Sequence, residues 1–165
     1  MTKRFDERFR DAEGKPFEFE GHLVHQIYRR EIEPGTLIDI EFHGSRGKPI
    51  QGLELKTKGA RLAWDEHGVE GQSIRIWADK QPRATIRYVN RRKTVELAVW
   101  NIWLDERSGR HSHEPERYDV VQAWWAWSGM LIDEDAVGVR LSCSGNHDGP
   151  DFDDLTATLA FKRDT

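Results

Sequence analysis

Polar and hydrophobic residues alternate with a period of two along most of the chain. Ile38, Ile40 and Phe42 are separated by polar residues, and the segment 155–161 shows the same alternation. Because successive side chains of a strand point to opposite faces of a sheet, this pattern predicts strands with one buried face. Turn signals such as Pro34-Gly35 separate these segments at short intervals, which is typical of proteins built from many short antiparallel strands.

A hairpin is predicted from residues 85–88 and 94–104, which flank a polar, cationic turn. In the second of these strands the alternation changes, because Trp100 and Ile102 fall on the face opposite to the preceding apolar residues. Two interpretations fit this change: Asn101 marks a β-bulge, or both faces of the strand are covered there. Residues 120–127 predict a further strand, which carries three of the tryptophans.

About ten short strands and no long helix predict an all-β fold. We expect a single-domain antiparallel β-sandwich of the jelly-roll type over residues 1–165, and a closed β-barrel is the alternative. Residues 1–16 form a tail or a short helix. Phe5 and Phe9 are four positions apart and would share one helical face, and Gly14 would end the helix.

Composition narrows the class of protein. The 165 residues carry a net charge of -4 and a single cysteine, Cys143. This excludes an intrachain disulfide framework and gives no overall drive toward nucleic acid. The charged N-terminal segment lacks the apolar core of a signal peptide, and no apolar run is long enough to span a membrane. We therefore expect a cytoplasmic protein that binds neither membrane nor nucleic acid, although residues 80–93 contain six cations.

Seven tryptophans are the compositional feature that points to function. In a sandwich, adjacent tryptophans such as Trp124 and Trp125 face opposite ways, so one of them should reach a surface or a pocket. Exposed planar aromatic side chains stack on sugar rings and also anchor protein interfaces. We predict Trp77, Trp100 and Trp125 as ligand-binding residues, and we expect Trp64 and Trp103 to lie in the core.

The loop before the closing strand concentrates carboxylates. Asp148, Asp151, Asp153 and Asp154 lie within seven residues, and Ca²⁺ prefers oxygen ligands of this kind on a flexible loop. We predict Asp148, Asp151 and Asp153 as ligands of a Ca²⁺ ion that braces the loop. The alternative is a solvated acidic turn with no cofactor.

These features leave three functions open. The first is a non-catalytic binding module that recognises a carbohydrate-like or other small ligand, or a protein partner, through exposed tryptophans. The second is a small enzyme of the isomerase, cyclase or lyase type with an aromatic-lined pocket, whose polar groups would come from Asn101, Tyr88, His25 or Gln122. The third is an interaction protein of the inhibitor or immunity type. The sequence does not define the oligomeric state.

Overall fold

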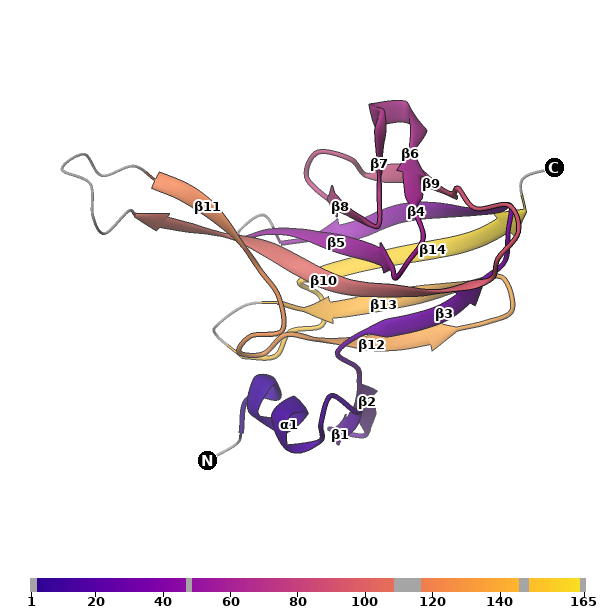
Figure 1. Ribbon diagram of the computed structural model, residues 1–165. Coiled ribbons are helices and arrows are strands. Elements are labelled where there is room, and N and C mark those ends of the chain that lie inside the picture. The colour runs from indigo at the N-terminus through magenta and orange to yellow at the C-terminus, as the bar shows by residue number, and fades with distance from the viewer. Residues whose placement is uncertain (1–2, 47–48, 109–116, 146–148, 164–165) are drawn as a thin grey trace.

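A computed structural model describes residues 3–46, 49–108, 117–145 and 149–163 (Figure 1). Strands dominate it, and one short helix lies near the N-terminus. In chain order the elements are α1 (Phe5–Asp11), β1 (Phe17–Phe19), β2 (His22–Val24), β3 (Tyr28–Ile32), β4 (Thr36–Ser45), β5 (Ile50–Thr57), β6 (Leu62–Trp64), the 3-10 helix η1 (Asp65–His67), β7 (Val69–Gly71), β8 (Ser73–Trp77), β9 (Arg83–Tyr88), β10 (Val95–Ser108), β11 (Arg117–Gln122), β12 (Gly129–Glu134), β13 (Gly138–Ser144) and β14 (Leu155–Arg163).

Two antiparallel sheets pack together as a β-sandwich, as the alternation predicts. The seven-stranded sheet has the order β12-β13-β14-β4-β9-β6-β7, and the five-stranded sheet has the order β11-β10-β5-β8, with β3 also paired to β10. The sheets do not close into a barrel, so the alternative fold is excluded for the described residues. Their inner faces meet in one hydrophobic core, to which both sheets contribute side chains such as Ile40, Leu53, Val99 and Leu141.

Strand β10 is partnered differently along its two edges. One edge pairs with β5 over residues 97–104. The other edge pairs with β3 over residues 95–99 and with β11 over residues 103–108. The pairing with β5 runs residue against residue without a shift, so Asn101 does not mark a bulge. Both faces of β10 are instead covered, because Trp100 on one face and Asn101 on the other are both buried.

Two sequence predictions about the strands are wrong, one about a pairing and one about the length of a strand. Strand β9 does not form a hairpin with β10, because β9 pairs with β4 and β6 in the seven-stranded sheet while β10 belongs to the other sheet. The segment between them crosses from one sheet to the other. The strand expected at 120–127 ends at Gln122, and the residues that follow form a loop.

The N-terminal segment forms a small unit of its own. The predicted helix is confirmed as α1, which begins after Arg4, whose amide donates to Glu7 Oε2 (2.8 Å). The short β1–β2 pair follows it, and α1, β1 and β2 lie together beside the edge strand β12 in Figure 1. Phe5, Phe9 and Val24 bury their side chains in a second hydrophobic cluster, separate from the main core. We call α1, β1 and β2 the N-terminal clasp.

Candidate functional site

The outer face of the five-stranded sheet carries tryptophans. Trp77 of β8 lies opposite Gly52 of β5, which in turn lies opposite Ile102 of β10. The next row of the same face contains Trp100. We call this surface, together with Trp124 from the loop after β11, the tryptophan face.

Gly52 makes room for the tryptophan ring beside it. A Cβ atom at Gly52 would lie 2.8 Å from Cε3 of Trp77 and 2.4 Å from the carbonyl oxygen of Ile76. The Trp77 ring therefore lies over Gly52 on the neighbouring strand β5, at a position where any larger residue would clash. Ile102, on the same outer face, is fully buried. The tryptophan face is thus a second packed layer on the side of the sheet that a sandwich ordinarily exposes to water.

An ion pair borders this aromatic surface. Glu54 lies directly opposite Trp100 in the sheet, and its Oε1 accepts a hydrogen bond from Nε of Arg75 at 2.6 Å. The Glu54 side chain is 12% exposed and the Arg75 side chain is 52% exposed. A carboxylate and a guanidinium therefore lie next to the aromatic rings, and the guanidinium is open to solvent.

The loop of residues 123–128, which we call the tryptophan loop, presents two more indole rings. Trp124 and Trp125 are each 40% exposed. The ring of Trp124 lies 5.0 Å from that of Trp100 with an interplanar angle of 39°. Trp124 and Ala126 both have a positive φ, of 58° and 52°, a backbone region that costs energy for residues other than glycine. Strained backbone of this kind gathers at binding and catalytic sites.

The three tryptophans predicted from the sequence have different environments. Trp125 is exposed and Trp77 is half-buried, as the surface or pocket role requires. Trp100 is only 6% exposed. The expectation of an accessible ring is therefore wrong for Trp100, because Trp124 packs against it. Sequence reasoning did not select Trp124, since the run 120–127 reads as a regular strand and hides the loop that exposes this ring.

The core assignments made for two other tryptophans are confirmed. Trp64 is 7% exposed and Trp103 is fully buried. The remaining tryptophan, Trp127, is half-buried in the second hydrophobic cluster, where its ring lies 5.3 Å from that of Phe5. The sequence pattern therefore identifies the core tryptophans Trp64 and Trp103, but it does not show that Trp100 on β10 is covered by Trp124 from the loop after β11.

The acidic loop before β14 is held by internal contacts. Asp154 is 1% exposed and accepts a hydrogen bond from the Gly145 amide at 3.0 Å. Arg46 makes ion pairs with both Asp154 and Asp151. The Asp153 amide donates to Asp151 Oδ1 at 3.0 Å, which is a turn of the kind that aspartate favours.

The Ca²⁺ ligands stay a prediction. Asp148 lies outside the described residues. Within the described part of the chain, no group of three or more His, Cys, Asp or Glu side chains is arranged to hold a metal ion. Nearby Cys143 is fully buried, and its burial, with the charge of Asp154, raises the pKa of the thiol. A raised pKa keeps the thiol protonated, whereas the nucleophilic form of cysteine is the thiolate.

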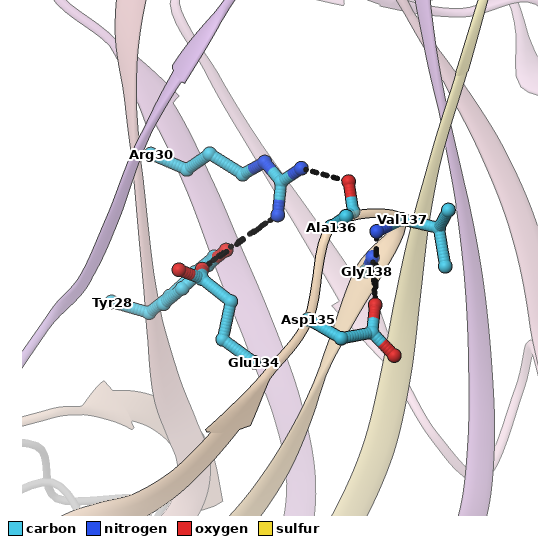
Figure 2. Close-up of polar contacts among 7 residues, drawn as sticks. All are labelled: Tyr28, Arg30, Glu134, Asp135, Ala136, Val137 and Gly138. Carbon is cyan, nitrogen blue, oxygen red and sulfur yellow. Dashed lines mark hydrogen bonds and ion pairs between the residues drawn. The ribbon is translucent and has the colours of Figure 1, made fainter.

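A second polar cluster closes one side of the sandwich (Figure 2). Tyr28 on β3 donates its hydroxyl to Glu134 at the end of β12. The Arg30 guanidinium lies 3.7 Å from Glu134 Oε2, donates to the carbonyl of Ala136 (3.1 Å) and covers the ring of Phe161 at 4.2 Å. Because β3 and β12 belong to different sheets, we call Tyr28, Arg30, Glu134 and Ala136 the latch.

A cavity of about 620 Å³ opens beside the latch, lined by residues 13–16, His25, Tyr28, Ile132 and Glu134 among others. Burial, reinforced by the Glu134 carboxylate, raises the pKa of the Tyr28 phenol to about 12. Burial also lowers the pKa of the His25 imidazole. Perturbed groups beside a cavity are a signature of catalytic sites. Here, however, the Tyr28 hydroxyl already binds Glu134, so its position is explained by the contact between the two sheets.

The polar residues proposed for an enzyme do not gather at this cavity. His25 lines it, but Asn101 is fully buried and donates to the Ser144 carbonyl at 2.8 Å. Tyr88 is buried in β9 of the seven-stranded sheet, where its hydroxyl donates to the Lys93 carbonyl at 2.7 Å. Among the residues that the structure describes, His25, Asn101 and Tyr88 therefore do not come together in one catalytic centre.

The cationic stretch 80–93 is partly neutralised by neighbouring carboxylates. Arg83 binds Glu41 at 3.0 Å and Arg87 binds Asp65 at 2.9 Å.

Comparison of the chain with protein-family models, curated proteins and solved structures gives no match. Within the described residues, no helix combines the length and the apolar composition that a membrane crossing needs.

Proposed function

We propose that the protein is a non-catalytic binding domain that holds a carbohydrate chain on the tryptophan face and the tryptophan loop. The observation that carries this proposal is the pair Trp124 and Trp125, each 40% exposed, on a loop whose backbone is held in a strained conformation. Each of these rings leaves a planar apolar surface in contact with solvent, which is what binding of a ligand requires.

The chemistry of the surface suits a sugar. Pyranose rings have apolar C–H faces and a rim of hydroxyl groups, so they need flat aromatic surfaces beside hydrogen-bonding groups. Indole rings supply large, rigid contact areas. The Arg75 guanidinium supplies donors, and the Glu54 carboxylate that it binds supplies an acceptor, both next to Trp100. An apolar ligand would not use this ion pair.

The spacing of the rings favours an oligosaccharide over a monosaccharide. Trp77 on β8 and Trp100 on β10 lie two strands and one row apart on the same face, so their backbones are about 12 Å apart. Because Trp124 covers Trp100, the rings that a ligand would contact are Trp77, Trp124 and Trp125. The tryptophan loop extends the aromatic surface beyond Trp100 through Trp124. A linear chain of sugars would therefore contact several rings at once.

A binding survey tests this proposal. Intrinsic tryptophan fluorescence is titrated with soluble cello-, chito-, xylo- and malto-oligosaccharides, and pull-down is carried out with the corresponding insoluble polysaccharides. We expect one class to bind, and Trp125→Ala and Trp124→Ala each to weaken that binding about tenfold, because an aromatic contact at the centre of an interface contributes more than about 1 kcal/mol.

The matched control is Val137→Ala. Val137 is 68% exposed but lies in the β12–β13 turn, away from the tryptophan face. We expect this variant to bind as the unaltered protein does. The proposal is rejected if no carbohydrate of the panel binds, or if binding persists unchanged in both tryptophan variants. If the protein retains a protein partner that oligosaccharides do not displace, this result would favour the interaction-protein hypothesis instead.

A further inference from the structure

The tryptophan loop is held from outside by the N-terminal clasp. In Figure 1 the chain descends from β11 to β12 on the side where α1 lies. There the Asp6 amide donates to the carbonyl of Ala126 (2.9 Å), and the Ala126 amide donates back to Asp6 Oδ2 (3.0 Å). One residue of the helix therefore satisfies both backbone groups of one loop residue.

Asp6 is itself fixed in place. Its side chain is 9% exposed, and Nη2 of Arg4 lies 3.1 Å from Oδ2, the oxygen that accepts from Ala126. Oδ1 accepts a hydrogen bond from the Glu7 amide at 2.8 Å. Hydrogen bonds to an ionised acceptor are roughly twice as strong as neutral ones. Contacts within the N-terminal segment therefore fix the orientation of the carboxylate that accepts from Ala126.

Apolar contacts press the same helix against the end of the loop. The ring of Phe5, which is fully buried, lies 5.3 Å from that of Trp127. At Gly129, the first residue of β12, a Cβ atom would lie 2.5 Å from Cγ1 of Val24 and 3.3 Å from Cδ2 of Phe5. The clasp therefore packs directly on the backbone that leaves the loop.

These contacts lie where the backbone is strained. Trp124 and Ala126 both adopt the left-handed region, which costs about 1–2 kcal/mol for a residue with a Cβ atom. Such a conformation persists only when surrounding contacts determine it. Ala126 is 2% exposed, so loss of the Asp6 acceptor would leave its amide buried without a partner, a further cost that the loop would avoid by relaxing.

We infer that Asp6 is a positioning residue of the tryptophan loop: its carboxylate sets the backbone of Ala126 and thereby holds Trp124 against Trp100 in the arrangement that receives the ligand. This inference rests on the proposed carbohydrate-binding function. It extends that function, because it makes the N-terminal clasp a determinant of affinity although the clasp contributes no residue to the tryptophan face. By linkage, ligand bound to the face must in turn tighten the contact between the clasp and the loop.

Three variants test the inference. Asp6→Ala removes the acceptor, Asp6→Asn keeps a side-chain oxygen that can accept from the Ala126 amide, and Asp11→Ala is the matched control. Asp11 lies on the same helix, where it pairs with Lys3 at 2.8 Å and has a 58% exposed side chain.

The first measurement needs no ligand. Indole rings 5.0 Å apart couple their transitions, so the Trp100–Trp124 pair should give a circular-dichroism couplet in the far ultraviolet, identified by its loss in Trp124→Phe. We expect Asp6→Ala to lose most of this couplet while its unfolding remains cooperative, and Asp6→Asn and Asp11→Ala to keep it. The second measurement is affinity for the oligosaccharide found in the survey, where we expect about tenfold weakening in Asp6→Ala and restoration to within about twofold in Asp6→Asn.

The outcomes separate the inference from the proposed function. A couplet that survives in Asp6→Ala overturns the inference, and so does a lost couplet with unchanged affinity. Equal weakening in Asp11→Ala overturns it as well, because the effect would then be general loss of the helix. If the unaltered protein binds no carbohydrate, the proposed function fails, and the role assigned to Asp6 in ligand affinity fails with it. The couplet then still decides whether Asp6 sets the loop conformation.

Discussion

The outer faces of the two sheets follow the same alternation but have opposite compositions. On the seven-stranded sheet, the outward residues of β4, β9 and β14 are paired polar groups, such as Thr85 with Asp39 (2.8 Å) and Lys162 with Asp39 (2.7 Å). On the five-stranded sheet, the corresponding positions include Trp77, Trp100 and Ile102. The first face is an ordinary solvated surface, whereas the second combines tryptophan rings with the Glu54–Arg75 ion pair.

This difference teaches where the chain departs from the simplest sandwich. Individual exposed apolar residues need no explanation, whereas several tryptophans gathered on one outer face are the feature on which the proposed binding surface rests. Trp100 and Ile102 on this face are buried and belong to the same hydrophobic cluster as the residues between the two sheets. Four predictions test how different the two faces are, in order of decreasing effect.

The largest effect is expected at Trp100. Trp100→Ala should lower the free energy of unfolding by about 3 kcal/mol, because truncation of a large buried ring leaves a cavity beside Ile102. Urea unfolding followed by circular dichroism at 222 nm measures it, with Thr85→Ala on the other outer face as the control, for which we expect less than about 0.5 kcal/mol. Equal small effects at both positions would show that the tryptophan face is no second packed layer.

Two glycines provide the next comparison. Gly52→Ala should destabilise by about 2 kcal/mol, because the added methyl group meets the Ile76 carbonyl oxygen and the Trp77 ring. Gly44, in β4 of the other sheet, has no atom within 4 Å of the added Cβ position, so Gly44→Ala should leave the thermal midpoint almost unchanged. If Gly52→Ala left the stability of the protein unchanged, the Trp77 ring would not lie against β5.

Acid should weaken the ion pair and hydrogen bond that Asp39 makes on the outer face of the seven-stranded sheet. A hydrogen bond from Lys162, supported by one from Thr85, lowers the pKa of Asp39 below the ordinary value of an aspartate, 3.8. The contribution of this carboxylate to stability is therefore present above that value and is lost as the pH falls through the lowered pKa. Asp39→Asn should cost about 0.5 kcal/mol at pH 6, discounted for solvent screening, and the cost should shrink as the pH falls through the lowered pKa of Asp39. The cost is measured by urea unfolding of both proteins from pH 6 to pH 2. A cost of Asp39→Asn that stayed constant over this range would contradict the prediction.

The smallest effect belongs to an exposed ion pair. A double-mutant cycle on Arg83 and Glu41, whose side chains are 78% and 43% exposed, should give a coupling energy of about 0.3 kcal/mol. Repetition in 1 M NaCl should reduce it further, because salt screens exposed charges. A coupling above about 1 kcal/mol would show that the charged face is not solvated in the ordinary way.

Much of the fold follows from local pattern. The alternation of Ile38 with Ile40 and the alternation within 155–161 predict β4 and β14, and both strands bury the expected residues. The pair Phe5 and Phe9 predicts the buried face of α1. These segments obey one rule along their whole length, so the period of two or the spacing of four is sufficient.

Strand partners and the site could not be predicted in the same way. A cationic turn between two alternating segments reads as a hairpin, yet β9 and β10 separate into different sheets because each finds its partners far along the chain. Residues 120–127 have the composition of a strand, but contact with Asp6, more than a hundred positions away, holds Ala126 in a conformation that no strand permits. Tertiary contacts override local propensity at the very place where the candidate site lies.

The position of β14 has a consequence for synthesis of the chain. The last described strand lies between β13 and β4, so it joins two parts of the seven-stranded sheet. At elongation rates of about 5–20 residues per second, roughly 5–20 s pass between the appearance of β4 and that of β14. During this time β4 lacks the partner that β14 later provides, and β13 lacks it for the last part of the interval. An open strand edge beside an apolar surface is where strands of other molecules add, so the chain is exposed to aggregation at β4 until β14 has been made.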